Sequence, residues 1–249
     1  MPQVTTGALI LQVFEYGETS RILRLLTTTH GVQSAIAKGV RRPRSQFAGL
    51  MEPFAEGVAT LYIKESRDLQ TLAGFELTRS RQALGRDLVR FAGASLIAEI
   101  LLRTVGVEPN PELFELVTAA LDRVEGSTPE ATESVVLSEA WRLVASLGFA
   151  PGLDECLDCT REIAPDEDVS FDYAAGGIRC DDCAVGAPGR RIPARAVAAL
   201  RAMLLGGDVQ IDRTQGHWWL LERFLDHHVL EGSTLRSFAF LSEALETSS

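Results

Sequence analysis

All four cysteines of this 249-residue chain occur in two pairs with the same internal spacing. Cys156 and Cys159 form the first pair, Cys180 and Cys183 form the second, and twenty residues separate the pairs. A Cys-x2-Cys turn places two sulfurs at the separation that a tetrahedral zinc ion requires, and two such turns at this distance are typical of a zinc site. Thiol–disulfide chemistry needs only one such pair. The sequence therefore predicts one Zn²⁺ per chain, with a structural role because four thiolates leave no position for water or substrate.

The residues around the cysteines form a strongly acidic segment. Residues 169–179 have the pattern of a hairpin that delivers the second cysteine pair, and residues 151–183 carry a formal charge of −8. This charge argues against contact with phosphates, so we expect a fold-stabilising or protein-binding module at 151–188. A divalent-ion site is the alternative use of the acids, and we favour a solvated hairpin face. The acids in question are Asp166, Glu167, Asp168 and Asp172.

The N-terminal part of the chain has a β pattern. Five short runs of strand-forming residues, separated by turn residues, lie at 9–16, 21–29, 32–37, 53–63 and 69–77. Five such strands predict a small closed barrel of the OB type, and OB barrels bind single-stranded nucleic acid on one face through loops and aromatic side chains. Each aromatic residue of the barrel is a candidate for stacking, although burial in the core is the favoured interpretation for each. These candidates are Phe14, Tyr16, Phe47, Phe54 and Tyr62.

The densest positive charge follows the third predicted strand. Between Glu18 and Glu52 the chain has six Lys or Arg residues and no Asp or Glu, although its formal net charge is −10. Gly39 and Pro43 prevent a regular helix there. Uncompensated guanidinium groups on a short loop attract phosphates, which Arg binds bidentately, whereas a solvated basic turn without a ligand is the alternative. The predicted nucleic-acid-binding residues are Arg21, Arg24, Lys38, Arg41, Arg42 and Arg44.

Helical periodicity lies on both sides of the cysteine module. Apolar residues recur at helical spacing from Leu84 to Val105, and two further helices are predicted to start at Asn110 and at Thr128, each followed by proline. Helical patterns resume after Pro193. The predicted fold class is multidomain α+β. It comprises a five-stranded OB-fold β-barrel at 1–79, an all-α helical domain in two parts at 80–150 and 189–249, and an inserted four-cysteine zinc module at 151–188.

No catalytic or nucleotide-binding motif is present in the sequence. It lacks the glycine-lysine phosphate loop of ATPases, the zinc-protease HExxH motif, the GxSxG nucleophile elbow and the dinucleotide-binding glycine pattern. No apolar run approaches the length needed to cross a bilayer, and the N-terminus has no signal-peptide pattern. We therefore expect a non-catalytic cytoplasmic protein without nucleotide or membrane partners.

These parts, in this order, resemble the RecO family of bacterial recombination mediators. The resemblance rests on Ala-Lys-Gly-Val-Arg-Arg-Pro-Arg-Ser at 37–45, on Phe-Ala-Gly-Leu-Met-Glu-Pro-Phe at 47–54, and on helices interrupted by two Cys-x2-Cys turns. It covers essentially the whole chain. It implies an OB-fold domain, a helical domain and an inserted zinc module. The strongly acidic remainder of this chain is a departure that limits how far a DNA path extends beyond the barrel.

The resemblance also implies the activities and partners of the family. These are binding of single- and double-stranded DNA, annealing of complementary strands without ATP, and, with RecR in the RecFOR pathway, loading of RecA onto DNA coated by single-strand-binding protein (SSB). The helical domain is expected to recognise the acidic, hydrophobic-ended C-terminal tail of SSB, and the protein is expected to associate with the nucleoid. Two other classes stay open. One is a zinc-ribbon and OB regulatory or RNA-binding protein without annealing activity, and the other is a nuclease that uses the acidic hairpin with Mg²⁺.

Overall fold

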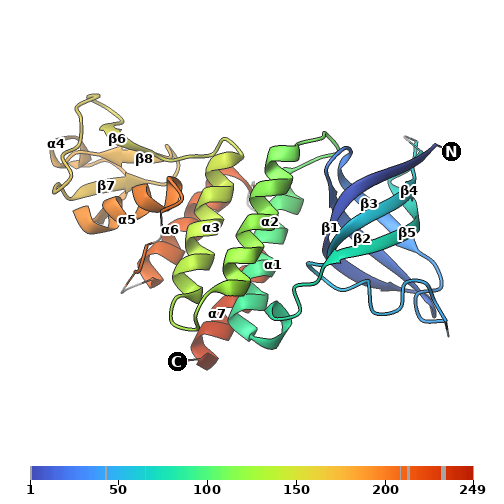
Figure 1. Ribbon diagram of the computed structural model, residues 1–249. Helices are drawn as coiled ribbons and strands as arrows, with labels where there is room; N and C mark the ends of the chain where they lie inside the picture. The colour runs from blue at the N-terminus through green and yellow to red at the C-terminus, as the bar shows by residue number, and fades with distance from the viewer. Residues whose placement is uncertain are drawn as a thin grey trace. The chain divides into compact units, whose positions relative to one another are not determined.

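The computed structural model describes most of the chain as two compact units, Met1–Gly126 and Ser127–Ser249 (Figure 1). The described residues are 2–42, 44–64, 66–207, 209–211, 214–230 and 234–248. Helices occur in both units. The domain bounds expected from the sequence, at 79, 150 and 188, stay a prediction.

The N-terminal unit begins with the barrel that the sequence predicts. Its strands are β1 (Gln3–Tyr16), β2 (Ser20–Thr27), β3 (Gly31–Ala37), β4 (Glu56–Tyr62) and β5 (Leu69–Arg79). They close in the order β1-β2-β3-β5-β4, and β4 pairs again with β1. Every pairing is antiparallel except that of β3 with β5. The expectation of a five-stranded OB-type barrel is confirmed.

The starts of two strands differ from the predicted ones by more than one residue. Strand β1 starts at Gln3 rather than at residue 9, because residues 3–9 pair with the whole of β4. Strand β4 starts at Glu56 rather than at residue 53, because Phe54 adopts a positive φ of 67° just before it. Polar residues and a glycine in 3–8 conceal the first half of β1 from pattern analysis.

The barrel interior is filled by side chains that alternate along each strand, as expected for a sheet with one buried face. The residues before β4 also contribute, because Val40, Phe47 and Met51 point into the same core. The segment between β3 and β4 therefore closes one end of the barrel. The buried cluster comprises Ala8, Ile10, Leu23, Leu25, Ala35, Ala37, Val40, Phe47, Met51, Ala55, Ala59, Leu61, Leu72 and Phe75.

A short 3-10 helix, η1 (Leu84–Arg86), and two α-helices, α1 (Leu88–Thr104) and α2 (Pro111–Gly126), complete the N-terminal unit. The side chain of Asn110 accepts a hydrogen bond from Leu113 N–H at 2.9 Å, which confirms it as the predicted cap of α2. Arg81 fixes the barrel to α2. Its fully buried guanidinium donates to Asp122 at 2.6 Å and to Glu56 of β4 at 2.7 Å.

The C-terminal unit combines four longer helices with a small sheet and a short helix (Figure 1). Helix α3 starts at Thr132 rather than at the predicted Thr128, whose carbonyl accepts the Thr132 N–H at 3.0 Å. The sheet has the order β6-β8-β7-β9. The elements are α3 (Thr132–Ser146), β6 (Gly152–Cys156), β7 (Val169–Asp172), β8 (Gly177–Arg179), α4 (Asp181–Ala184), β9 (Arg190–Ile192), α5 (Ala194–Leu204), α6 (Gln215–His228) and α7 (Arg236–Ser248).

Aromatic side chains connect the sheet to the helices of this unit. Phe224 of α6 packs against Trp141 of α3 with ring centroids 5.3 Å apart and against Phe171 of β7 at 6.4 Å. All three side chains are fully buried, so the small sheet shares its core with α3 and α6. In neither unit does a helix of the described chain have the length and apolarity required to span a membrane.

Candidate nucleic-acid interface and metal centre

The four cysteines form one cluster in the C-terminal unit. Each sulfur lies within 4.8 Å of the other three, and the sulfurs of Cys159 and Cys180 are 3.9 Å apart. The first pair lies on a turn at the end of β6, where Thr160 N–H donates to the Cys156 carbonyl. The second pair starts at the cap of α4, after the predicted hairpin of β7 and β8. The structure thus brings together all of the predicted metal ligands.

The cluster fits a tetrahedral metal ion. A Zn–S bond of about 2.3 Å places the sulfurs of a tetrahedral site about 3.8 Å apart. Although burial raises the pKa of Cys156, backbone N–H groups from Cys159, Cys180 and Asp158 lower it to about 6. Hydrogen bonds with the sulfurs of Cys180 and Cys159 raise the pKa of Cys183 to about 12. Four thiolates this close repel one another, and a cation between them removes that repulsion.

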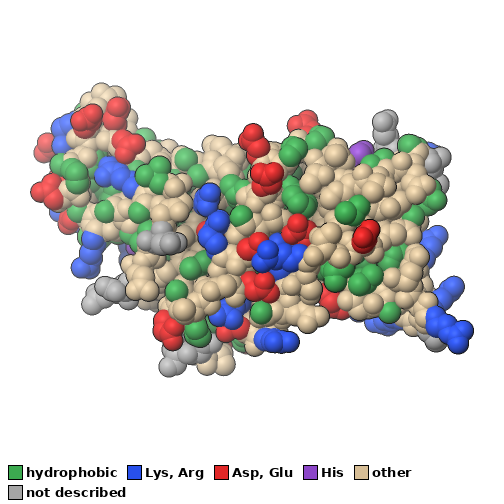
Figure 2. All heavy atoms as spheres, in the orientation of Figure 1, with side chains coloured by type: hydrophobic (Ala, Val, Ile, Leu, Met, Phe, Trp, Pro, Cys, Tyr) green, Lys and Arg blue, Asp and Glu red, His purple; other side chains and the backbone are tan. Residues whose placement is uncertain are grey.

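Of the four acids considered as an alternative ion site, three have partners in the structure, and Asp166 has none among the described residues. Glu167 pairs with Arg161 at 2.5 Å, Asp172 pairs with Arg179, and Asp168 accepts the Ala194 N–H at the start of α5 at 2.9 Å. Figure 2 shows Asp and Glu side chains gathered over the small sheet. Among the described residues, the cysteine cluster is the one group identified with metal-binding geometry.

The basic turn, residues 38–44, leaves the barrel directly after β3. Its described residues form hydrogen-bonded turns, with Arg42 N–H donating to the Gly39 carbonyl at 3.1 Å and Ser45 N–H to the Arg42 carbonyl at 3.0 Å. Gly39 has a φ of +72°, which glycine adopts without strain. Val40 is buried in the barrel core. The turn is therefore anchored by its backbone and by one apolar side chain while its cations face outward; Pro43 lies outside the described residues.

Three of the six predicted nucleic-acid-binding residues are exposed cations of this turn without an acidic partner in the described part of the chain. They are Lys38, Arg42 and Arg44. Arg44 adopts a positive φ of 63°, unusual for a residue with a side chain. Lys and Arg side chains project from the barrel in Figure 2.

Two further predicted residues are not the uncompensated cations that the sequence indicates. Arg21 binds Glu15 through Nε at 3.2 Å and lies 3.7 Å from Glu52, and Arg41 pairs with the second carboxylate oxygen of Glu15. The stretch between Glu18 and Glu52 contains no acid, but β1 lies antiparallel to β2 and places Glu15 directly opposite Arg21. The sequence pattern missed this ion pairing because the carboxylate of Glu15 comes from the neighbouring strand, outside that stretch.

Arg24, the sixth predicted residue, lies on the outer face of β2 opposite Gln12 and Ser34. Its Nε is buried and has no hydrogen-bond partner among the described residues. An unsatisfied buried donor costs free energy, and the role of Arg24 in nucleic-acid binding stays a prediction.

A row of side chains crosses the outer face of the barrel next to these cations. Directly paired residues point to the same side of a sheet, and the pairing aligns Phe14, Ile22, Ile36, Thr71 and Tyr62 across β1, β2, β3, β5 and β4. We call these five residues the outer row. Phe14 is 49% exposed and Tyr62 38% exposed, and Tyr16, two residues beyond Phe14, is 52% exposed.

The aromatic candidates therefore divide into two groups. Phe14, Tyr16 and Tyr62 are accessible for stacking, whereas Phe47 and Phe54 are buried. Phe54 contacts the ring of Phe91 of α1 with centroids 5.7 Å apart. For the two buried residues the favoured core interpretation is confirmed, and for the three exposed ones it is wrong.

Two exposed cations of the barrel were missed by the sequence pattern. Lys64 and Arg67 lie in the turn between Tyr62 of the outer row and Leu69 at the start of β5. In the sequence they alternate with Glu65 and Asp68, so that the turn has no net charge. The loop between the fourth and fifth strands flanks the ligand face in OB folds, and that position is the signal that identifies them.

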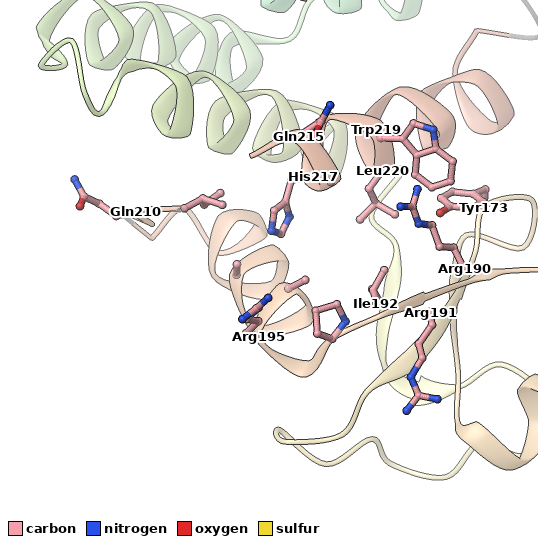
Figure 3. A pocket seen from close by; sticks show the side chains of 15 residues that line it. Tyr173, Arg190, Arg191, Ile192, Arg195, Gln210, Gln215, His217, Trp219 and Leu220 are labelled. Atoms are coloured by element: carbon pink, nitrogen blue, oxygen red, sulfur yellow. The ribbon is translucent and has the colours of Figure 1, made fainter. Parts of the chain in front are cut away.

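The C-terminal unit has a pocket of about 830 Å³ between β9, α5 and α6 (Figure 3). Trp219, Tyr173 and Arg190 lie on one side of it, and His217 and Arg195 lie on the other. The guanidinium carbon of Arg190 is 4.2 Å from the centre of the Trp219 ring, a cation–π contact. Ile192 and Leu220 add apolar surface.

The pocket favours an anionic ligand. Arg195 is exposed and has no acidic partner among the described residues, whereas Arg191 pairs with Asp181. Burial lowers the pKa of His217, which leaves arginine as the source of positive charge near neutral pH. The buried hydroxyl of Tyr173 has no hydrogen-bond partner among the described residues. Pattern analysis missed this pocket because its residues come from separate elements.

Comparison with known proteins gives consistent matches over almost the whole chain. Residues 1–81 match the family model "Recombination protein O N terminal", and residues 85–237 match "Recombination protein O C terminal". The chain is similar to the DNA repair protein RecO of Anaeromyxobacter sp. (strain K), with 33% identity over 98% of this chain and 97% of that protein. It is 32% identical to the DNA repair protein RecO of Myxococcus xanthus, over 98% of both chains. The corresponding protein of Nocardioides sp. is 33% identical over 96% of this chain and 93% of its own length.

The barrel, the helices and the four-cysteine cluster thus occur in a chain that matches the N-terminal and C-terminal models of one family and almost the full length of its relative from Anaeromyxobacter. This chain belongs to the RecO family of DNA repair and recombination proteins.

Proposed function

We propose that this protein binds single- and double-stranded DNA through its barrel, anneals complementary strands without ATP and, with RecR, helps to load RecA onto DNA coated by SSB. The observation that carries the proposal is the combination of two features on one barrel. Lys38, Arg42 and Arg44 follow β3 as exposed cations that have no acidic partner among the residues the structure describes, and exposed aromatic side chains stand on the outer face.

Annealing requires a surface that neutralises two phosphate backbones and leaves the bases free to pair. Phosphate contacts carry no sequence information, so such a surface accepts any strand. Stacking on Phe14, Tyr16 or Tyr62 holds single-stranded bases without reading their hydrogen-bonding edges. The free energy of annealing comes from base pairing, which agrees with the lack of an ATPase motif in the sequence. The barrel segment 1–80, with a formal charge of +2, is the favoured site, because the remainder of the chain is acidic or neutral.

The proposed role is binding rather than catalysis. A nuclease that uses Mg²⁺ requires free carboxylates directed at one ion. In the acidic hairpin, Glu167 and Asp172 are bonded to arginines and Asp168 to a backbone amide. These contacts favour the structural interpretation of the hairpin.

Zinc is the ion that we propose for the cysteine cluster, one per chain, held by Cys156, Cys159, Cys180 and Cys183. Four thiolates with nearly tetrahedral spacing are typical of structural zinc sites, and such sites contribute folding free energy directly. Here the ion would hold the turn after β6 to the cap of α4. The acidic surface of the module makes a role in phosphate binding unfavourable.

The pocket of the C-terminal unit is the proposed binding site for the acidic, hydrophobic-ended tail of SSB. Arg195 and Arg190 offer charge for carboxylates, and Trp219 and Leu220 offer apolar surface for a terminal side chain. Charged and aromatic anchors of this kind dominate the affinity of small peptide interfaces.

The test of the proposed function is strand annealing together with DNA titration at two or more salt concentrations, with and without Mg²⁺ and ATP. A Lys38→Ala/Arg42→Ala variant should bind single and double strands roughly tenfold more weakly, and each lost phosphate contact should flatten the plot of log affinity against log salt by about 0.7 on single strands. Annealing should fall in parallel. An Arg86→Ala/Arg103→Ala variant removes the same charge from exposed helical positions of the same unit and should bind like the parent.

The alternatives give different results in the same assay. Shortened strands in the presence of Mg²⁺ would indicate a nuclease, and tight RNA binding without annealing would indicate a regulatory protein. Unchanged affinity and salt dependence in the Lys38→Ala/Arg42→Ala variant would reject the assignment of the basic turn.

A further inference from the structure

The carboxylate of Glu15 occupies the position of a ligand between two arginines of the DNA interface. One oxygen accepts from Arg21 Nε at 3.2 Å and the other accepts from Arg41. The Glu15 side chain is 48% exposed and that of Arg41 is 49% exposed. Carboxylate and phosphate offer guanidinium groups the same arrangement of paired oxygen acceptors. Glu15 therefore holds the two guanidinium groups as a bound phosphate would.

We propose that Glu15 is an affinity-determining residue of the DNA interface that competes with DNA phosphates for Arg41. The inference rests on the proposed DNA-binding function of the barrel. When DNA binds, the Arg41–Glu15 pair is exchanged for a pair of Arg41 with phosphate, and the freed carboxylate stays beside the strand. The exchange lowers affinity and lets strands leave after they have paired, which suits annealing.

The backbone contacts of the basic turn indicate that Glu15 competes with phosphate for Arg41 and is not needed to hold the turn in place. Arg41 N–H donates to the Thr19 carbonyl at 3.2 Å, and Arg42 N–H donates to the Gly39 carbonyl at 3.1 Å. Val40 fixes the turn in the barrel core. The turn thus keeps its place without Glu15, so the carboxylate directs only the side chain of Arg41.

Arg21 is held independently as well. Its Nη1 donates to the Met51 carbonyl at 3.0 Å and lies 3.7 Å from Glu52, and its side chain is only 23% exposed. Loss of Glu15 leaves Arg21 in these contacts and releases Arg41 alone. An exposed ion pair is weak enough for phosphate to displace it.

The decisive variant is Glu15→Gln, compared with Glu18→Gln. Glu18 lies in the adjacent turn, is exposed and has no acidic or basic partner among the described residues, so its variant reports the general effect of removing one negative charge. Glu15→Gln should raise affinity for single and double strands roughly twofold to fivefold more than Glu18→Gln does. It should also steepen the salt dependence on single strands by up to about 0.7, because no freed carboxylate beside the strand then offsets the phosphate contact of Arg41.

The same pair of changes in an Arg41→Ala background separates competition from a general field effect. Without Arg41, Glu15 has no guanidinium group to compete for, so the additional gain in DNA affinity of Glu15→Gln over Glu18→Gln should disappear. Thermal unfolding of each variant serves as the folding control. Glu15→Gln binding that is equal to or weaker than the parent's, or an excess that persists without Arg41, would overturn the proposal.

These measurements distinguish failure of the Glu15 proposal from failure of the proposed DNA-binding function. If Lys38→Ala/Arg42→Ala weakens binding while Glu15→Gln gives no gain, the DNA interface stands and only the competition is rejected. If Lys38→Ala/Arg42→Ala binds like the parent, the assignment of the interface fails and the Glu15 proposal fails with it.

Discussion

Phe14 and Tyr16 stand on the outer face of β1 with about half of each side chain exposed, at 49% and 52%. Exposed aromatic side chains contribute little to folding when they lack packing partners, but they offer flat surfaces to unstacked bases. Bases in a duplex are already stacked on one another and are not available to these rings. In the proposed DNA interface, we therefore expect these two residues to favour single strands over double strands.

The resulting prediction concerns a Phe14→Ala/Tyr16→Ala variant. Its single-strand affinity should fall by about 1–3 kcal/mol for each base that loses its stacking partner, whereas duplex affinity should change little. Fluorescence titration with a single-stranded oligonucleotide and with its duplex measures both. Leu88→Ala, at a similarly exposed apolar position of α1, is the control. Equal losses on the two forms of DNA would exclude selective stacking.

Individual residues also show where sequence patterns reach their limit. The cluster of Arg and Lys at 38–44 is visible in the sequence, and the exposure of Lys38, Arg42 and Arg44 agrees with it. The pairing of Arg41 with Glu15 is not visible there, because it depends on the register of β1 with β2. Burial of Phe47 has the same origin, since its ring fills the barrel end formed by distant strands. A local cluster of charge can be read from the sequence, whereas an ion pair with an acid on a neighbouring strand cannot.

At the scale of elements, the turn after β6 and the cap of α4 meet through the four cysteines, a few backbone contacts and an ion pair between Asp158 and Arg179 at 2.8 Å. Cys180 N–H donates to the sulfur of Cys156 at 3.4 Å, and Leu157 N–H donates to the Ile178 carbonyl at 2.9 Å. The sheet itself packs on α3 and α6, but the apolar side chains of the two cysteine segments are exposed, with Leu157 at 38% and Val185 at 84%. These segments therefore gain much of their stability from a metal ion. The module should therefore depend on the ion for its fold.

A Cys183→Ser variant tests this dependence. Purified parent protein should contain close to one zinc per chain by elemental analysis, and the variant should contain much less and should lose protease resistance within 151–188. DNA affinity should stay close to the parent value, because the module is acidic. Asp182→Asn, at the neighbouring exposed position, should keep its zinc. A parent protein with well under one zinc per chain would contradict the prediction.

Most elements were predictable because their patterns are local. Each Cys-x2-Cys turn, the cap at Asn110 and each of the five β runs is contained in a short stretch of sequence. The first half of β1 was not predictable, because its partner is β4, about 50 residues later. The pocket was not predictable either, because Tyr173, Arg195 and Trp219 are far apart in sequence and meet only when β9, α5 and α6 pack.

At the scale of the whole molecule, the two proposed ligand sites belong to different units with different charge. The barrel offers exposed cations and aromatic rings for DNA, and the C-terminal unit offers a pocket with Arg195 and Trp219 for an acidic peptide. An interface based on a few anchors loses most of its affinity when these are truncated. Changes at one site should therefore leave the other site functional.

A separation-of-function experiment follows from this arrangement. Arg195→Ala/Trp219→Ala should weaken binding of an SSB tail peptide at least tenfold and should slow annealing of SSB-coated strands, while binding and annealing of bare strands stay near the parent values. Glu222→Ala, at an exposed position of α6, the helix that carries Trp219, is the control. Isothermal titration with the peptide and annealing with intact or tail-less SSB provide the measurements. Full peptide affinity in the double variant would remove the pocket from consideration as the tail site.

Closure of the barrel has a consequence for assembly on DNA. Because β4 returns to pair with β1 and β3 pairs with β5, each barrel strand has a neighbour on both sides. An open sheet edge invites strand addition, domain swapping and aggregation. The described barrel strands therefore give another copy of the protein no free edge strand to pair with, which disfavours fusion of two barrels through main-chain hydrogen bonds. In the proposed DNA complex we expect copies that bind beside one another to meet through side chains, which separate more readily than a shared sheet when complementary strands pair.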